Sequence, residues 1–424
     1  MMLWIILLLF LLLLPLGVPV GLILLVLSVA YVIMEPALMD VVLAQRIVQG
    51  TQSFPLLAVP LFILVGELMN ISGISRRVMD FAAVLTRRMW GGLAQTNVLL
   101  STLLAGMSGS ANGDAAMQAK IIVPEMTKRG YPLPYATALT AVSSLIAPMI
   151  PPGIGLILFG FVTNTSIGQL FAAAIVPGFL LAFMMLGQAY FTSRVNKWDP
   201  PRERLASDPS LGRSFLGALP AIMLPVLIIV GIRGGVFTPA EAAGVAVVYT
   251  VVCVIAYREA DWGQVWTALR STVSTTAAIL LILAASTAFS WVLTFEQVPQ
   301  TIAGGLLSFT DNPTLMLALI AGLILVAGAF IEGTALILIL GPIFLPVTNA
   351  LGIDPVHYGV VFVLMAHLGG VTPPVGTIMF TTCTITKTPL VAFTKAVIPM
   401  ILTYLAFALI LIFVPVFSTG LAHL

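Results

Sequence analysis

The stretch G-M-S-G-S-A-N-G-D, from Gly106 to Asp114, lies inside one of the most apolar parts of this chain. In lipid, every backbone N–H and C=O needs a partner within the protein, and each group left without one costs several kcal/mol. Irregular backbone at membrane depth is tolerated only where protein or a water-filled cavity satisfies it. The stretch therefore predicts a functional interruption of membrane-embedded helical structure.

The composition indicates a polytopic membrane protein. Of 424 residues, 60% are hydrophobic and 8% are charged, and the mean hydropathy is +1.12, whereas a soluble domain has about 25% charged residues. Residues 1–20 lack the basic segment that opens a signal peptide, so we expect a retained first helix that turns at Leu16–Pro19. Cys253 and Cys383 support neither a disulfide framework nor a metal site. The chain has no phosphate-binding loop, nucleophile elbow or zinc-protease motif, which argues against ATP hydrolysis.

The sequence around the opening stretch is repeated. V-P-E-M-T-K-R-G-Y-P followed by I-P-P-G-I-G reappears as L-P-V-T-N-A-L-G-I-D-P followed by T-P-P-V-G. A spacing of 222 residues relates five pairs: Gly106 and Gly328, Pro124 and Pro346, Gly130 and Gly352, Pro151 and Pro373, and Pro152 and Pro374. A fixed period of this kind indicates an internal duplication. We predict two homologous halves, 1–193 and 214–424, joined by a cytoplasmic linker at 194–213.

The distribution of positive charge predicts that the two halves are inverted. Four arginines precede the first copy of the repeat: Arg76, Arg77, Arg87 and Arg88. The counterpart at 297–313 has no Lys or Arg. Because cytoplasmic loops are enriched in Lys and Arg, the same element is cytoplasmic in one half and external in the other. This topology places fifteen basic residues inside, Arg46 and Arg233 outside and Lys120 at hairpin depth, with both termini outside.

Inverted repeats with broken helices are typical of secondary transporters, whose sites lie near the midplane. We predict re-entrant hairpins at about 92–124 and 312–346, because each is too short for two full crossings of about 20 residues. Proline interrupts helices, so the proline pairs predict broken helices at 150–153 and 372–376. Backbone carbonyls freed at such breaks, with Ser and Thr hydroxyls beside them, suit Na⁺.

The motifs G-M-S-G-S-A-N-G-D-A-A-M, K-R-G-Y-P and I-P-P-G-I-G, followed by L-G-I-D-P-V-H-Y-G-V-V and G-G-V-T-P-P-V-G, resemble the large membrane subunit (M, DctM-like) of tripartite ATP-independent periplasmic (TRAP) transporters. The resemblance covers essentially the whole chain. It implies an all-α, inverted-repeat elevator-type transporter, similar to the ion transporter superfamily, with two re-entrant hairpins and two broken helices.

The resemblance also implies a function and partners. The protein would be a Na⁺-coupled importer of organic acid anions (carboxylates) in the bacterial inner membrane. It would work with a small four-helix membrane subunit (Q type) and a periplasmic substrate-binding protein (P type), and it would bind two or more Na⁺ ions.

Residue by residue, the resemblance places one Na⁺ site at the first hairpin tip and broken helix, and a second at their counterparts. The first comprises Ser108, Gly109, Ser110, Asn112, Pro151, Pro152 and Gly153. The second comprises Gly328, Gly333, Thr334, Thr372, Pro373, Pro374 and Gly376. The predicted substrate residues lie between the tips: Ser108, Ser110, Asn112, Asp114, Glu332, Thr334 and Thr377. No arginine lies at either tip, so we do not expect an arginine clamp on the anion.

Some of these residues also have structural interpretations. Gly106 and Ser110 have the spacing with which small residues pack membrane helices together. Asp114 and Glu332 are carboxylates at hairpin depth, where a functional role is the default, but charge-paired structural roles remain open. Pairing of Asp114 with Lys120 is disfavoured, because six residues along a helix place the two side chains on different faces.

Other charged residues are expected to be structural. We predict that Glu67 and Glu241 are anchors near helix ends and that His367 is a hydrogen-bonded packing residue. Segment 76–88 is either an amphipathic interfacial helix or a cytoplasmic loop with topogenic charges.

Three alternative functions compete with this interpretation. One is a self-sufficient Na⁺/dicarboxylate symporter of similar fold, which would need no binding protein. The others are an intramembrane enzyme, for which we find no matched nucleophile and base, and a passive channel, for which a repeated hairpin arrangement is not expected.

Overall fold

The computed structural model describes residues 9–10, 12–13, 18–35, 40–203 and 210–422, and within these ranges all regular structure is helical. Seven helices are long and apolar enough to cross a membrane, or eight if the bent pair 133–149 and 154–163 forms one span. The polytopic membrane class is therefore confirmed. Leu16 and Gly17 of the expected first turn lie outside the described residues.

The first half contains the following elements: α2 (Val20–Met34), α3 (Asp40–Gln49), η1 (Phe54–Leu57), α4 (Ala58–Ile71), α5 (Ile74–Thr86), α6 (Gly92–Ser108), α7 (Ala111–Lys128), α8 (Leu133–Ser143), η2 (Ser144–Met149), α9 (Ile154–Thr163) and α10 (Ile167–Val195). The second half contains α11 (Leu211–Arg233), α12 (Pro239–Tyr257), α13 (Trp262–Phe295), α14 (Val298–Leu307), α15 (Pro313–Gly328), α16 (Gly333–Ala350), α17 (Pro355–Gly369), α18 (Thr377–Thr386), α19 (Leu390–Phe413) and α20 (Val416–Thr419).

Helix boundaries follow the 222-residue spacing of the sequence repeat. Helix α7 ends at Lys128 and α16 ends at Ala350, while α8 begins at Leu133 and α17 begins at Pro355. Both proline pairs contain a cis peptide bond, and Gly130 and its counterpart Gly352 both have positive φ. The equivalent turns therefore have the same local backbone in both halves.

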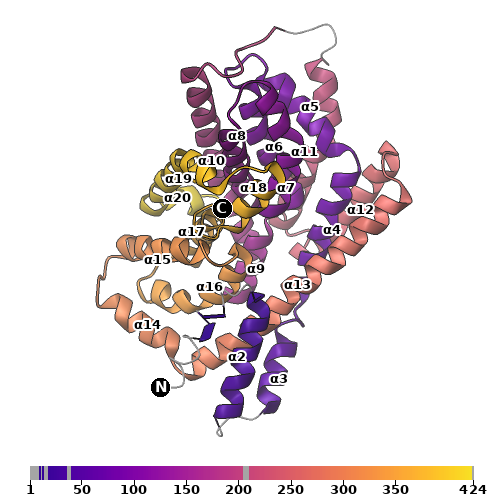
Figure 1. Cartoon of the computed structure of the whole chain (residues 1–424). Helices are drawn as coiled ribbons and strands as arrows, with labels where there is room; N and C mark the ends of the chain where they lie inside the picture. Colours follow the sequence, from indigo (N-terminus) through magenta and orange to yellow (C-terminus); the bar gives the residue numbers. More distant parts are fainter. Residues whose placement is uncertain (1–8, 11, 14–17, 36–39, 204–209, 423–424) are drawn as a thin grey trace.

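Helix α13 is the largest departure from this correspondence. It runs unbroken for 34 residues, or about 51 Å, whereas the equivalent part of the first half is divided into α3, η1 and α4. In Figure 1, α13 crosses the molecule diagonally, from α2 at one end to α12 at the other. It packs against α2, α3 and α4, and α4 also packs along α12.

Most of the segment 76–88 is helical: Arg76 and Arg77 lie in the amphipathic helix α5, and Arg87 and Arg88 lie in the turn that follows it. The apolar face of α5 packs on α11 and α6. Arg77 donates to Glu259 at 2.6 Å, and its guanidinium lies 3.9 Å from the centre of the Tyr257 ring. The helix is thereby tied to the turn between α12 and α13.

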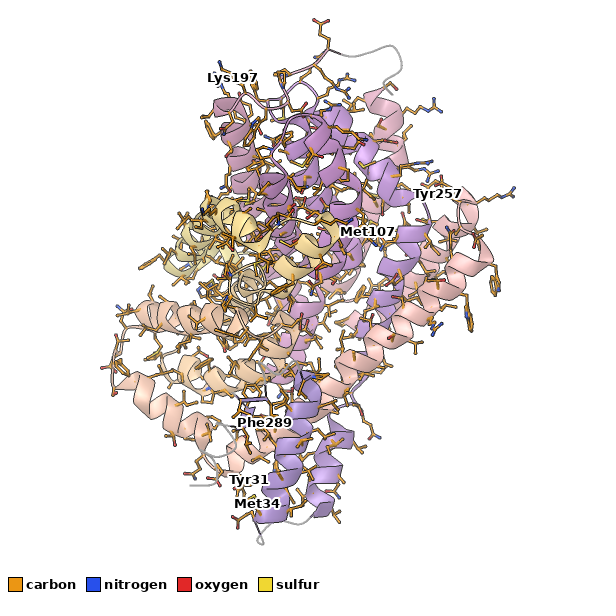
Figure 2. All side chains as sticks on the ribbon, viewed as in Figure 1. Tyr31, Met34, Met107, Lys197, Tyr257 and Phe289 are labelled. Atoms are coloured by element: carbon orange, nitrogen blue, oxygen red, sulfur yellow. The ribbon has the colours of Figure 1, made fainter. Side chains whose placement is uncertain are left out.

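Different helices lie at the two ends of the molecule. Helix α5 and the start of the linker lie at one end, and α3 and α14 lie at the other (Figure 1). In Figure 2, Lys197 marks the first end and Tyr31 and Met34 the second, with Met107 between them. Helix α5 and its sequence counterpart α14 are thus at opposite ends, and the tip of the first hairpin lies at intermediate depth.

The start of the linker is fastened to the base of the first hairpin. The buried Asp199 carboxylate accepts from the Leu93 backbone N–H at 2.8 Å and from the Arg129 guanidinium at 2.9 Å. Leu93 is in the first turn of α6 and Arg129 follows the end of α7. Asp199 therefore joins both ends of the hairpin, and Trp198 adds a ring contact to Tyr135, with centroids 4.9 Å apart.

We expect Asp199→Ala to destabilise this junction by about 2 kcal/mol, because it removes two hydrogen bonds to a charged acceptor. The measurement is the midpoint of thermal unfolding in detergent, together with the rate of proteolysis within 194–213. Glu203→Ala is the matched control, because Glu203 is an exposed residue of the same linker. Equal midpoints and cleavage rates for the two variants would contradict this role for Asp199.

Candidate functional site

The first hairpin consists of α6 and α7, and its tip is short. Gly109 has φ +55° and ends α6, and the Ser110 side chain accepts from the Gly113 N–H at 3.3 Å to cap α7. A Cβ on Gly109 would lie 2.6 Å from the Pro152 carbonyl oxygen. Since the Gly109 carbonyl also accepts from the Ile154 N–H at 3.4 Å, the tip is in direct contact with the first break.

The second hairpin consists of α15 and α16 and contacts the second break in a similar way. The Ala329 carbonyl accepts from the N–H groups of Val375 and Gly376, each at 3.1 Å. Glu332 caps α16 by accepting from the Ala335 N–H at 3.1 Å and from the Thr334 hydroxyl at 2.9 Å. In each half, irregular backbone of the tip pairs with irregular backbone of the break.

Both hairpins extend further than the sequence predicted. Helix α7 continues from Pro124 to Lys128, and α16 continues from Pro346 to Ala350. The approximate predicted ends at 124 and 346 therefore lie four residues before the observed helix ends. Within membrane helices, neighbouring groups satisfy the carbonyl that proline leaves free.

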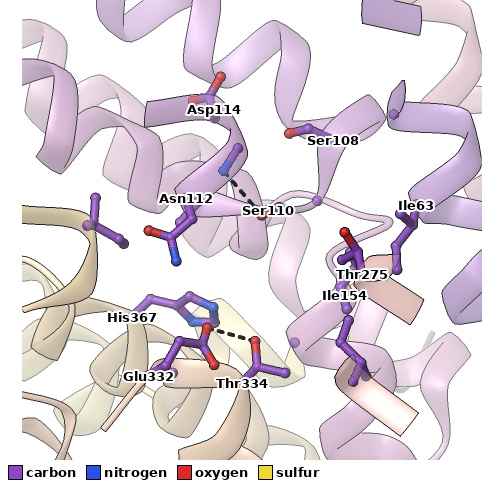
Figure 3. A pocket seen from close by; sticks show the side chains of 18 of the residues that line it. Ile63, Ser108, Ser110, Asn112, Asp114, Ile154, Thr275, Glu332, Thr334 and His367 are labelled. Carbon is purple, nitrogen blue, oxygen red and sulfur yellow. Dashed lines mark hydrogen bonds between the residues drawn. The ribbon is translucent and has the colours of Figure 1, made fainter. Parts of the chain in front are cut away.

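A cavity of about 410 Å³ lies between the two tips and is closed on another side by α4 and α13. It is lined by all seven residues that the sequence predicted to bind substrate: Ser108, Ser110, Asn112, Asp114, Glu332, Thr334 and Thr377. Figure 3 shows the first hairpin's side chains facing Glu332, Thr334 and His367 across this space. Residues more than two hundred positions apart in the chain therefore meet in one cavity.

The described residues that line the cavity include three carboxylates and no Lys or Arg. Asp114 and Glu332 come from the hairpins, and Glu67 comes from α4. Glu67, predicted as an anchor near a helix end, lies four residues before the end of α4, and its carboxylate accepts from the Ser271 hydroxyl at 2.7 Å. The sequence did not predict that Glu67 also lines the cavity. The predicted anchor Glu241 does cap the start of α12.

Asp114 belongs to a buried hydrogen-bond network. Gln118 Nε2 donates to Asp114 Oδ2 at 2.8 Å and to Ser101 Oγ at 2.6 Å. Ser143 Oγ, which lies 3.3 Å from Ser101 Oγ, donates to Asn97 Oδ1 at 2.6 Å and so extends the network from the hairpin to α8. Asp114 therefore finds a partner other than Lys120, whose side chain is exposed, as the sequence favoured.

His367 is a hydrogen-bonded residue in the wall of the same cavity. Its Nδ1 lies 2.7 Å from the Val363 carbonyl oxygen, which acts as the acceptor, so Nδ1 carries the proton. Its ring contacts the hairpin and the broken helix, because a Cβ on Gly155 or Gly333 would lie 3.0 and 3.4 Å from its carbons. The prediction of a hydrogen-bonded packing residue is confirmed. The sequence did not predict that His367 also lines the cavity.

The predicted Na⁺ residues divide into two groups. Six line the cavity: Ser108, Gly109, Ser110, Asn112, Gly333 and Thr334. The others lie beside the tips and outside the cavity wall: Pro151, Pro152, Gly153, Gly328, Thr372, Pro373, Pro374 and Gly376. The first break is buried, whereas Pro374 in the second is exposed.

The chemistry of the first tip fits a hard cation. Ser108 Oγ and Asn112 Oδ1 are buried and have no hydrogen-bond partner among the described residues. Buried polar atoms are normally paired, so these two oxygens, with the Pro152 carbonyl beside Gly109, are suited to a bound ion. The part of the chain that the structure describes has no cluster of three His, Cys, Asp or Glu side chains for a transition metal.

Sequence patterns did not identify the wall that α4 and α13 contribute. Besides Glu67, it includes Asn70, Thr275, Ala278 and Ile282. Ala278 and Ile282 are ordinary apolar residues of a spanning helix, and Thr275 belongs to the polar run S-T-V-S-T-T at 271–276. Asn70, a polar residue near the end of the apolar helix α4, offered a signal of its own.

Comparisons with known proteins give the family. The model of the family described as "Tripartite ATP-independent periplasmic transporter, DctM component" matches residues 7–417. A sialic acid TRAP transporter large permease protein of Vibrio cholerae is 37% identical over 96% of this chain and 95% of its own. A C4-dicarboxylate TRAP large permease protein of Pseudomonas aeruginosa is 36% identical over 90% and 89%, and a 2,3-diketo-L-gulonate TRAP large permease protein of Escherichia coli is 35% identical over 88% of both.

Two solved transporters share the fold. The YdaH transporter of Alcanivorax borkumensis aligns with a TM-score of 0.65 at 17% identity, covering 92% of this chain and 95% of that one. MtrF of Neisseria gonorrhoeae aligns with a TM-score of 0.53 at 14% identity, covering 87% and 82%. The relatives in sequence are transport permeases rather than enzymes. The chain belongs to the DctM component family of the tripartite ATP-independent periplasmic transporters, and it is a multi-pass permease subunit of the bacterial inner membrane.

Proposed function

We propose that this chain is the large permease subunit of a Na⁺-coupled importer of organic acid anions. The observation that carries the proposal is the charge of the cavity between the hairpin tips: its lining, in the part of the chain that the structure describes, has three carboxylates and no Lys or Arg. A carboxylate substrate would be repelled there unless cations entered with it. At 4 Å and an effective dielectric constant of 20, one unit cation offsets about 4 kcal/mol of such repulsion.

Na⁺ is the cation that the oxygen ligands favour. Ser108, Gly109, Ser110 and Asn112 would hold one ion together with the carbonyls at Pro151–Gly153, and the second tip and break would hold another. A bound Na⁺ would order the tip and present its hydroxyls and N–H groups to the anion. Because the two ligands then stabilise each other, each raises the affinity of the other, which is the basis of symport.

The relatives suggest the class of substrate. Their names give a sialic acid, a C4-dicarboxylate and 2,3-diketo-L-gulonate, all of which are carboxylates. The cavity of about 410 Å³ is large enough for an anion of this size. The half-helix N-termini at Ser110 and Glu332 direct partial positive charge toward it.

For the transport step we propose an elevator motion of an inverted repeat. The hairpins and broken helices would move as one body past a scaffold that includes α2, α4, α11, α12 and α13. Helix α5, tied to the scaffold through Arg77 and Glu259, would connect the scaffold to the first hairpin. Both termini and α14 would face the periplasm, and α5 and the linker would face the cytoplasm.

The proposed partners are those of the family. A small four-helix membrane subunit (Q type) would enlarge the scaffold, and a periplasmic binding protein (P type) would deliver the anion. The chain exposes many large apolar side chains on α11, α12 and α13, as expected of surfaces in contact with lipid or a membrane partner.

We expect uptake of a carboxylate into proteoliposomes to require both an inward Na⁺ gradient and the binding protein. The assay contains this chain and its small partner, with radiolabelled sialic acid, succinate and 2,3-diketo-L-gulonate tested separately. Uptake driven by Na⁺ without the binding protein would favour a self-sufficient symporter instead. Accumulation of all three anions without Na⁺ would contradict the proposal.

We expect Ser110→Ala and Thr372→Ala each to raise the Na⁺ concentration for half-maximal uptake about tenfold, since each removes one oxygen ligand and tenfold corresponds to about 1.4 kcal/mol. The same variants should show a matching loss of Na⁺-dependent thermal stabilisation. Ser308→Ala is the control, because Ser308 is exposed and lies outside both hairpins. Unchanged Na⁺ affinity in both Ser110→Ala and Thr372→Ala would contradict the assignment of these Na⁺ sites.

A further inference from the structure

A second cavity, of about 560 Å³, lies toward the opposite end of α13 from the α12 junction. It is bounded by α3, α13, the end of α9 and α16. Its polar lining comprises Arg46, Gln49, Asn164, Ser286, Thr287, Ser290 and Thr294. The charge distribution of the sequence predicts that this end faces the periplasm.

The charge of this cavity is opposite to that of the cavity between the tips. Among the described residues that line it, Arg46 is the only charged one, and none is Asp or Glu. The Arg46 guanidinium makes no ion pair with any residue in the described part of the chain. Arg46 is exposed, so an anion can reach it from the medium.

A buried hydroxyl also lacks a partner in this cavity. Ser286 is only 3% exposed, and its Oγ has no hydrogen-bond partner among the described residues. Thr287 and Thr294, by contrast, donate to main-chain carbonyls of α13. A buried hydroxyl without a partner is uncommon, and it offers a donor to a carboxylate held by Arg46.

The backbone of α3 is placed to hold Arg46 at this position. Gly50 follows the end of α3, and a Cβ there would lie 2.7 Å from Thr287 Oγ1. The Gly50 N–H donates to the Arg46 carbonyl at 3.0 Å. The close approach of α3 to α13 therefore positions the turn that carries Arg46 beside the cavity.

Both cavities are lined by residues of α13. Thr275, Ala278 and Ile282 line the first, and Ser286, Ser290 and Thr294 line the second. These positions are spaced by three or four residues, so each neighbours the next in a row that winds around the helix. From Ala278 to Ser290 the axial distance is about 18 Å. An anion moving along α13 would pass from a basic cavity to an acidic one.

We propose that the cavity beside Arg46 is an outer binding site for the carboxylate group of the transported anion, with Arg46 as the charged ligand and Ser286 as a hydroxyl donor. The site receives the anion before the cation-dependent cavity takes it up. The identity of the anion rests on the proposed function. The effect of the Arg46 charge on the potential in the cavity does not depend on transport.

The test measures the local potential at position 290. In a Cys253→Ala, Cys383→Ala background, Ser290→Cys is modified in proteoliposomes with an anionic and a cationic methanethiosulfonate reagent of similar size. We expect Arg46→Gln to lower the ratio of the anionic to the cationic rate constant about fivefold, since a unit positive charge is removed from the cavity that position 290 also lines. In Arg46→Lys, which keeps the positive charge, the ratio should stay close to that of the parent. Arg233→Gln is the matched control, because Arg233 lies at the same end but lines a different cavity.

The same cysteine reports binding. Succinate, sialic acid and 2,3-diketo-L-gulonate are added separately, and we expect at least one to slow modification in the parent but not in Arg46→Gln, with mannitol as the neutral control. An unchanged reagent ratio in Arg46→Gln, or protection that persists in that variant, would overturn the proposal. Absence of protection by all three anions would also overturn it. Failure of Na⁺-driven uptake in the parent would contradict the proposed function but not the outer site, because the modification rates are measured without a gradient.

Discussion

The structure depends on the requirement that backbone freed at a break in a membrane helix be paired inside the protein. Four interruptions occur in the part of the molecule that forms the central cavity, two at hairpin tips and two at proline pairs. They pair with each other: the Gly109 carbonyl accepts from Ile154 in one half, and the Ala329 carbonyl accepts from Val375 and Gly376 in the other. Because each break satisfies a tip, neither could persist alone in an apolar environment.

The cavity between the tips results from this pairing. Two short tips that meet two breaks cannot fill the space as continuous helices would, and hydroxyl, amide and carboxylate groups remain around it. The buried network from Asp114 through Gln118 and Ser101 attaches the first tip to α8, and Asp199 joins the two ends of the same hairpin at its base. Hydrogen bonds therefore hold the hairpin both at its tip and at its base.

Charge is separated along the molecule. Three carboxylates line the cavity between the tips, whereas the described residues that line the cavity beside Arg46 include one basic residue and no acidic one. Helix α13 lines both cavities, and its counterpart in the first half is divided into three shorter elements. The duplicated halves have therefore diverged in their scaffold helices, while the hairpins and breaks retain equivalent boundaries.

The sequence by itself predicted the membrane class, two hairpin tips and two breaks; with the family resemblance it also predicted seven of the polar residues that line the central cavity. Gly, Pro and small polar residues in apolar surroundings have few structural explanations, and the 222-residue spacing related one half to the other. It predicted α5 as a helix only as one of two alternatives, and α7 and α16 continue four residues beyond Pro124 and Pro346, where the predicted hairpins end. Only the tertiary structure decided which scaffold residues face the cavity. By local sequence alone, Glu67 is compatible with an anchor, Thr275 with a packing residue and Arg46 with a charge at a helix end. Each lines a cavity only because its helix meets segments that are distant in the chain.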